Sequence, residues 1–119
     1  MTKEEMKSRT KQYGLRVIKV VQALPNDRVA NVLSSQLLRS GTSVGANDRA
    51  ACGAKSTADF INKLKIVEEE SDESLYWMKM LVESGLMPAR KLSELMKEGD
   101  EILAITVASL RSNRIAARP

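Results

Sequence analysis

The chain has 119 residues, 43 % of them hydrophobic and 29 % charged, and a formal net charge of +4, a composition that predicts one folded domain and excludes a disordered chain. It lacks both an apolar run of about 18 residues and the apolar segment of a signal peptide, so we expect a cytoplasmic protein that does not bind membranes. Because there is no histidine and only one cysteine, Cys52, we expect no catalytic residue, no metal site, no cofactor and no enzyme activity.

Apolar residues recur at spacings of three and four in four successive segments, which predicts four helices. These cover about residues 3–24, 27–53, 56–84 and 89–115, with Pro25, Gly53 and the Gly85–Pro88 stretch at the breaks. Long helices joined by short turns pack as antiparallel neighbours. The sequence therefore predicts an all-α fold, an up-down-up-down antiparallel four-helix bundle in a single domain, residues 1–119.

The second predicted helix contains an unusual stretch, LLRSGTSVGANDR at residues 37–49. Its composition would also suit a loop, but it has neither the GxxxxGK[ST] pattern nor the preceding strand of a phosphate-binding loop. A continuous helix keeps the apolar residues on one stripe, although each glycine costs about 1 kcal/mol relative to alanine. Gly41 and Gly45 are four residues apart beside Ser40, which predicts a face that admits another helix backbone. The loop remains the alternative.

Polar residues of the second and third helices are expected to fix how these helices pair. Antiparallel packing brings Arg39 opposite Glu70 and Glu73, which share one helical face because they are three residues apart. We expect an interhelical ion pair, with acid–base chemistry or metal binding as the alternative. Ser43 and Asn47 lie one turn apart and are expected to specify register or oligomeric state, with substrate binding as the alternative.

Tyr76 and Trp77 form the only adjacent aromatic pair. Neighbouring helical residues point about 100° apart, so the two rings form no single stacking platform. We expect them to anchor a subunit interface, and stacking on a nucleic-acid base is the alternative.

Three motifs carry a family resemblance: RSGTSVGAN at residues 39–47, DFINKLKI at residues 59–66, and E-x-x-E-x-x-Y-W at residues 70–77. Together they resemble the 23S ribosomal RNA intervening-sequence protein family over residues 13–86. The resemblance implies a bacterial four-helix bundle that forms a ring-shaped homopentamer. It also implies kinship with accessory proteins of diversity-generating retroelements, which bind nucleic acid and associate with a reverse transcriptase.

The third predicted helix departs from the family pattern. Glu68, Glu69 and Asp72 stand where members commonly carry apolar or basic residues. This difference argues against a nucleic-acid surface along the third helix.

Charge is distributed unevenly along the chain. Residues 1–25 contain six basic and two acidic residues, whereas residues 55–85 contain four basic and seven acidic ones. In the predicted bundle the start of the first helix and the end of the fourth lie at the same end, where basic residues recur on one face of each. This predicts an electrostatic nucleic-acid surface, with a solvated face as the alternative. The residues expected there are Lys3, Lys7, Arg9, Lys11, Arg111, Arg114 and Arg118.

The leading hypothesis from the sequence is a non-enzymatic, oligomeric four-helix-bundle protein. It would bind RNA or DNA electrostatically and act as an accessory or assembly factor linked to ribosomal RNA insertions or to a reverse transcriptase. The alternative is a protein-interaction or scaffolding ring that has no nucleic-acid role.

Overall fold

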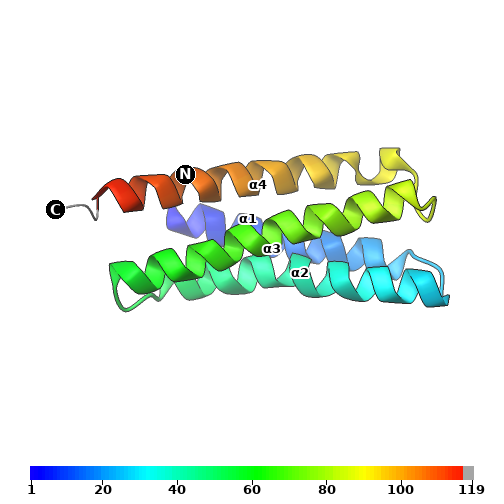
Figure 1. Ribbon diagram of the computed structural model, residues 1–119, viewed down its shortest axis with the longest axis horizontal. Coiled ribbons are helices and arrows are strands. Elements are labelled where there is room, and N and C mark those ends of the chain that lie inside the picture. Colours follow the sequence, from blue (N-terminus) through cyan, green and yellow to red (C-terminus); the bar gives the residue numbers. More distant parts are fainter. Residues whose placement is uncertain (117–119) are drawn as a thin grey trace.

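The computed structural model describes the backbone of residues 1–116 and the side chains of residues 1–113. This part of the chain forms four helices: α1 (Lys3–Gln22), α2 (Arg28–Cys52), α3 (Thr57–Glu83) and α4 (Ala89–Ala116). They run antiparallel to their sequence neighbours in a molecule measuring 52 × 21 × 21 Å (Figure 1). The fold is therefore the predicted all-α, antiparallel four-helix bundle.

Side-chain caps define where the first three helices begin. Thr2, Asp27 and Ser56 each accept a hydrogen bond from the backbone N–H three residues later, which satisfies a donor that lacks an intrahelical partner. The turn after α3 requires a left-handed residue, and Gly85 supplies it with φ of 81°. The short connections predicted from Pro25, Gly53 and Gly85 therefore have a local physical cause.

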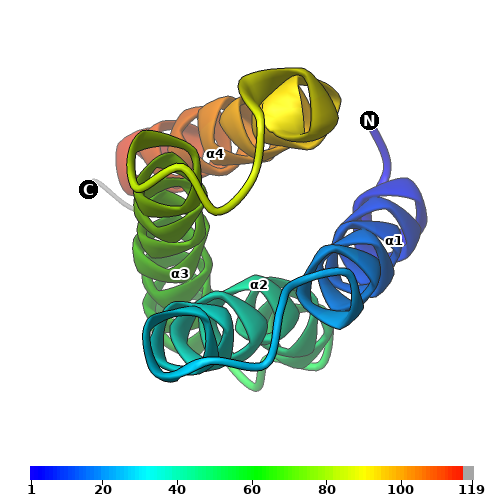
Figure 2. The same ribbon diagram turned by 90° about the vertical axis from the view of Figure 1, so that its right-hand side faces the viewer.

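The four helices form a square when viewed along the bundle (Figure 2). α2 packs extensively against α1 and α3, and α3 against α4, whereas α1 and α4 share the smallest contact. α4 has 28 residues and α1 has 20, so α4 extends beyond α1 at the end that holds both chain termini (Figure 1). Among the described helices, none has the length and apolar character that crossing a membrane requires.

The core is aliphatic and runs along the whole bundle. Val17, Leu37, Val44, Val67 and Met78 are fully buried within it. Burial of these side chains is the main source of stability, since each contributes about 1.5–3 kcal/mol on transfer from water.

Not every apolar residue at a helical spacing of three or four is buried. Val29 is 56 % exposed in the first turn of α2, and on α4 Ile102 is fully buried whereas the adjacent Leu103 is only partly buried. Both differences arise because a periodic pattern allows a choice between adjacent residues, and only the packing partners decide it.

Residues 37–49 lie entirely within α2, so the loop interpretation of this stretch is wrong. A Cβ added at Gly45 would lie 3.1 Å from the carbonyl oxygen of Thr10 and 3.2 Å from the backbone nitrogen of Lys11. At Gly41, an added Cβ would lie 2.8 Å from both γ carbons of Val17. The glycines therefore admit α1 at a distance that other residues would prevent.

Candidate nucleic-acid interface

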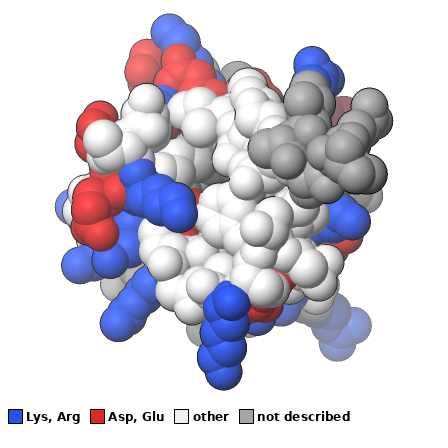
Figure 3. Space-filling model, turned by 90° about the vertical axis from the view of Figure 1, so that its left-hand side faces the viewer, with Lys and Arg blue, Asp and Glu red and all other residues white. Residues whose placement is uncertain are grey.

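The basic end predicted from the sequence is less concentrated than expected. Lys3, Lys11 and Arg111 are exposed there and Lys7 is half-buried. Figure 3 views this end and shows Lys and Arg side chains around its rim, separated by uncharged surface in the middle. The side chain of Arg114 and all of Arg118 lie outside the described residues. The described bases of this end do not merge into one patch.

Arg9 is engaged by acidic residues of α4. Its Nε donates to Oε2 of Glu98 at 2.7 Å, and its Nη2 donates to Oε1 of the same carboxylate at 2.7 Å and also to Glu101. The hydrogen bond to Glu98 raises the pKa of Arg9 further above its usual range, and the same bond lowers the pKa of Glu98. In this cluster, called the Arg9 cluster below, the positive charge is compensated within the protein. Its structural role is to join α1 to α4.

Arg39 forms a matching cluster between α2 and α3. Its Nη1 donates to Oε2 of Glu70 at 3.2 Å and its Nη2 donates to Glu73, whose Oε1 also accepts from Trp77 Nε1 at 3.2 Å. Burial raises the pKa of Glu70 even though Arg39 opposes that shift. The acids of both clusters are three residues apart on one helix, Glu98 with Glu101 and Glu70 with Glu73. We call the second group the Arg39 cluster.

Lys3 lies at the edge of the basic end and contacts an aromatic ring. Its Nζ is 4.8 Å from the centroid of the Phe60 ring, a distance at which a cation is attracted to the π face. Both residues line a cavity of about 300 Å³ at the start of α3, together with Lys55 and Asn113. Lys3 is thus held against the first turn of α3.

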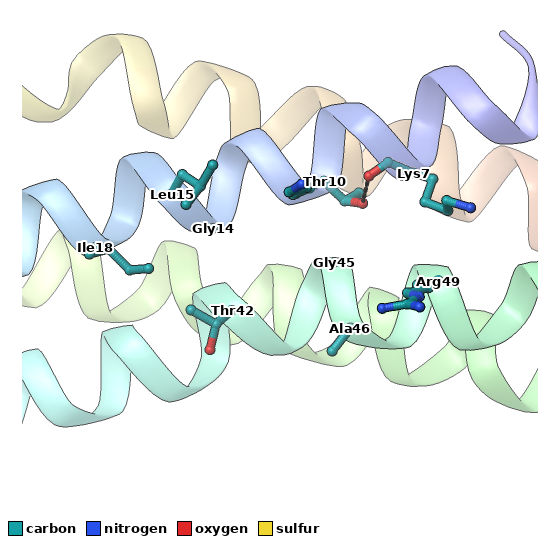
Figure 4. A pocket seen from close by; sticks show the side chains of 10 residues that line it. Lys7, Thr10, Gly14, Leu15, Ile18, Thr42, Gly45, Ala46 and Arg49 are labelled. Atoms are coloured by element: carbon teal, nitrogen blue, oxygen red, sulfur yellow. Dashed lines mark hydrogen bonds between the residues drawn. The ribbon is translucent and has the colours of Figure 1, made fainter.

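A second group of basic residues lies in a groove between α1 and α2. The groove has a volume of about 490 Å³, and three basic residues line one half of it: Lys7 and Lys11 from α1 and Arg49 from α2. Figure 4 shows Lys7 and Arg49 lying across the groove from each other. None of its lining residues is acidic; the others are Thr10, Gly14, Leu15, Ile18, Thr42, Gly45 and Ala46.

The floor of this α1–α2 groove is made of small or internally bonded residues. Gly14 and Gly45 carry no side chain, and Thr10 Oγ1 donates to the backbone oxygen of Met6 at 3.0 Å. The polar group of Thr10 is therefore already satisfied inside α1. As a result, the long side chains of Lys7, Lys11 and Arg49 dominate the chemistry of this half of the groove.

Ion pairing leaves most of the positive charge of the groove available. Lys11 and Arg49 form no salt bridge with a described residue, and Lys7 has one at 3.5 Å to Glu4, whose side chain is 80 % exposed. Such an exposed pair is screened by solvent and contributes under about 1 kcal/mol. A phosphate group entering the groove could therefore replace Glu4 at little cost.

Asp48 is a buried acid beside this region, and nothing in the sequence pattern distinguishes it from the exposed acids. It is 4 % exposed, its Oδ2 has no hydrogen-bond partner among the described residues, and burial raises its pKa while Lys7 opposes the shift. The neighbouring Asn47 was expected, with Ser43, to specify helix register or oligomeric state. Its side chain is half-buried and donates to the backbone oxygen of Ser43 at 2.9 Å. Ser43 in turn donates to the backbone oxygen of Arg39, so both act within α2.

The remaining predicted structural residues occupy different faces. Ser40 is buried and donates to the backbone oxygen of Gln36 at 2.8 Å, so its hydroxyl is satisfied within α2. Tyr76 is 53 % exposed, and its ring meets that of Trp77 edge to face at a centroid distance of 4.9 Å. The pair shares one side of α3 with Glu73, a hydrogen-bond partner of Trp77.

Apolar residues continue beyond the Arg39 cluster toward the α1–α2 turn. On α2, Val32 is 59 % exposed and Val29 is 56 % exposed; on α3, Tyr76 and Met80 are 53 % and 37 % exposed. The members of each pair are three or four residues apart, so they are neighbours on the surface of their helix. We call these four residues the α2–α3 apolar patch.

Two features of the site escaped the sequence analysis although a signal for each is present. Arg49 follows Gly41 and Gly45 at a spacing of four, so it belongs to the face of α2 that meets α1. Glu98 and Glu101 repeat the spacing of Glu70 and Glu73. Within the described residues, no group of three or more acidic, cysteine or histidine residues is placed to hold a metal ion.

These observations define a class: a small antiparallel four-helix bundle with two arginine–glutamate clusters and a basic groove between its first two helices. The family model for the 23S rRNA-intervening sequence protein matches residues 2–108. The chain belongs to this family.

A solved structure supports the same assignment. It is described as a protein of unknown function from the S23 ribosomal protein family of Bacteroides thetaiotaomicron VPI-5482. It is 32 % identical, superposes with a TM-score of 0.87, and the match covers 93 % of this chain and 99 % of that one. A comparison with curated proteins returned no match.

Proposed function

We propose that this protein is a non-enzymatic accessory factor that binds the phosphate backbone of nucleic acid through the α1–α2 groove. The observation that carries the proposal is the presence of Lys7, Lys11 and Arg49 along one groove that has no acidic lining residue. Phosphate contacts by lysine and arginine dominate the affinity of such sites and are independent of sequence. The family description refers to the 23S rRNA intervening sequence, so RNA from such an insertion is the first ligand to test.

The proposed surface differs from the end predicted from the sequence. Lys7 and Lys11 belong to both, Arg49 is new, and Arg9 is removed because Glu98 and Glu101 compensate its charge. Lys3 and Arg111 lie beyond the groove, where they would contact only a longer ligand.

The salt dependence of binding tests the proposal quantitatively. Three phosphate contacts predict a slope of about −2.7 in log Kobs against log salt for a duplex, or an affinity loss of about 40-fold between 50 and 200 mM. Arg49→Gln should reduce the slope by about 0.9. Lys91→Gln is the matched control, because it removes one exposed charge from the first turn of α4, at the opposite end of the bundle. Equal effects of the two substitutions would contradict the groove as the binding site.

A second candidate function is scaffolding by a homo-oligomer, and the α2–α3 apolar patch favours it. Exposed Tyr76 and Met80 beside Val29 and Val32 are the kind of residues that anchor protein interfaces. The homopentamer that the family resemblance implies is compatible with both candidates, whereas the reverse-transcriptase partner belongs to the accessory factor. Light scattering of the wild type and of Tyr76→Ser tests it, with a lower mass expected for the variant. A monomeric wild type at micromolar concentration would exclude the ring.

A further inference from the structure

We infer that the α1–α2 groove selects double-stranded over single-stranded nucleic acid, an inference that rests on the proposed function. Single-strand sites combine a basic groove with aromatic side chains on which successive bases stack, and each stacked base contributes about 1–3 kcal/mol. The groove supplies the charges but none of the stacking, because no aromatic residue lines it.

The whole chain contains four aromatic residues, and the structure describes all of them. Tyr13 is 1 % exposed and is hydrogen-bonded to Ser74 inside the bundle. Trp77 is partly buried, and its indole N–H is bound by Glu73. Neither ring is therefore free to stack on a base next to the groove.

The two other aromatic residues, Phe60 and Tyr76, both lie on α3. Tyr76 is exposed, but its helix also carries Glu68, Glu69 and Asp72, whose negative charges repel phosphates. Phe60 is half-buried and has the Nζ of Lys3 over its ring, so a base would have to displace that lysine. No aromatic residue of this protein is combined with the three basic residues of the groove.

Charge density then favours the duplex. Each phosphate contact releases more bound counterion from a duplex than from a single strand, with slopes of about 0.9 and 0.7 per contact. For three contacts, lowering the salt concentration from 1 M to 50 mM therefore raises the affinity for a duplex about sixfold more than the affinity for a single strand.

Rigidity acts in the same direction. Lys7 and Lys11 are separated by about 6 Å along a continuous helix, and Arg49 lies on a second helix held against the first by Gly45. The three side chains must be ordered for either ligand, but a flexible strand loses conformational entropy of its own when it is held, whereas a rigid duplex does not.

Fluorescence anisotropy at 50 mM salt tests the inference with three labelled probes: a 20-base-pair RNA duplex, a 20-base-pair DNA duplex and an unstructured 20-nucleotide oligouridine. Taking equal affinities at 1 M salt, where counterion release contributes nothing, the duplex probes should bind at least about fivefold more tightly than the single strand at 50 mM. Lys11→Gln should weaken duplex binding, whereas Lys91→Gln should leave it nearly unchanged. A smaller preference, or tighter binding of the single strand, would overturn the inference while leaving nucleic-acid binding intact.

Phe60→Leu distinguishes the other route to a single strand. If oligouridine binds more tightly than the duplexes and Phe60→Leu abolishes that binding, the cavity beside Lys3 is the site and the inference is overturned. If none of the three probes binds, the proposed function itself is refuted.

Discussion

Substituting Gly41 or Gly14 by alanine should have opposite effects on stability. Both glycines are inside helices, so alanine gains up to about 1 kcal/mol of intrinsic helix propensity at each. At Gly14 an added Cβ would lie 3.6 Å from Thr42 Cα, an ordinary contact. At Gly41 it would lie 2.8 Å from both γ carbons of Val17. Space, rather than propensity, decides the sign of the effect.

The size of the effect at Gly41 follows from the stiffness of its neighbour. Val17 is fully buried, and a valine in a helix has one strongly preferred rotamer, so neither γ carbon can turn aside. Overpacking of this kind costs about 1–3 kcal/mol. After the gain in propensity, Gly41→Ala should destabilise the protein by about 1 kcal/mol, while Gly14→Ala stabilises it by a similar amount.

Urea unfolding followed by circular dichroism at a fixed protein concentration measures both effects. Adding Val17→Ala to Gly41→Ala supplies a second measurement, because the added methyl group then fills part of the space that valine leaves. The double-mutant cycle should show a favourable coupling of at least about 1 kcal/mol. A Gly41→Ala variant as stable as Gly14→Ala, or strictly additive substitutions, would refute the close approach of α1 and α2 as the reason for glycine.

Three further predictions concern buried or bridging polar groups. Burial raises the pKa of Tyr13 to about 12 from an ordinary value of 10, so wild-type stability should fall between pH 10 and 12, and urea unfolding of Tyr13→Phe should lack most of that fall. Burial also raises the pKa of Asp48 in the folded state. The protonated carboxyl therefore contributes to the free energy of unfolding at acid pH, and this contribution is lost as the pH rises and the buried group ionises. Asp48→Asn should accordingly raise the melting temperature at pH 7 but not at pH 3. Arg9→Gln should cost about 1–2 kcal/mol and Arg39→Gln under about 1 kcal/mol in thermal unfolding, because the Arg9 side chain is 25 % exposed and that of Arg39 48 %; the reverse order would contradict this interpretation.

The overall fold could be predicted because its causes are local in the sequence. Apolar residues at spacings of three and four, with Asp27 and Ser56 as caps and Gly85 at a turn, specify four helices and their short connections. The pairing of Arg39 with Glu70 and Glu73 was also accessible, since an antiparallel turn near residue 54 fixes which residues meet.

The groove could not be predicted in the same way, because it depends on how two helices are rotated about their axes. Arg49 joins Lys7 and Lys11 only when Gly45 faces α1, a rotation that the composition of α2 suggests but does not determine. The sequence likewise placed Arg9 among the available bases. Its neutralisation requires Glu98, which is 89 residues away along the chain.

Pairing within the fold explains how a chain with a net charge of only +4 can present a basic surface. Acidic residues are concentrated on α3 and in the two arginine–glutamate clusters, where each cluster compensates one arginine and joins two helices. The acids of these clusters do not line the α1–α2 groove, where Lys11 and Arg49 form no salt bridge with a described residue and Lys7 interacts with Glu4 and Asp48. Local field strength depends on such placement rather than on the total. The arginine–glutamate pairs that join the helices therefore also keep Glu70, Glu73, Glu98 and Glu101 out of the lining of the groove.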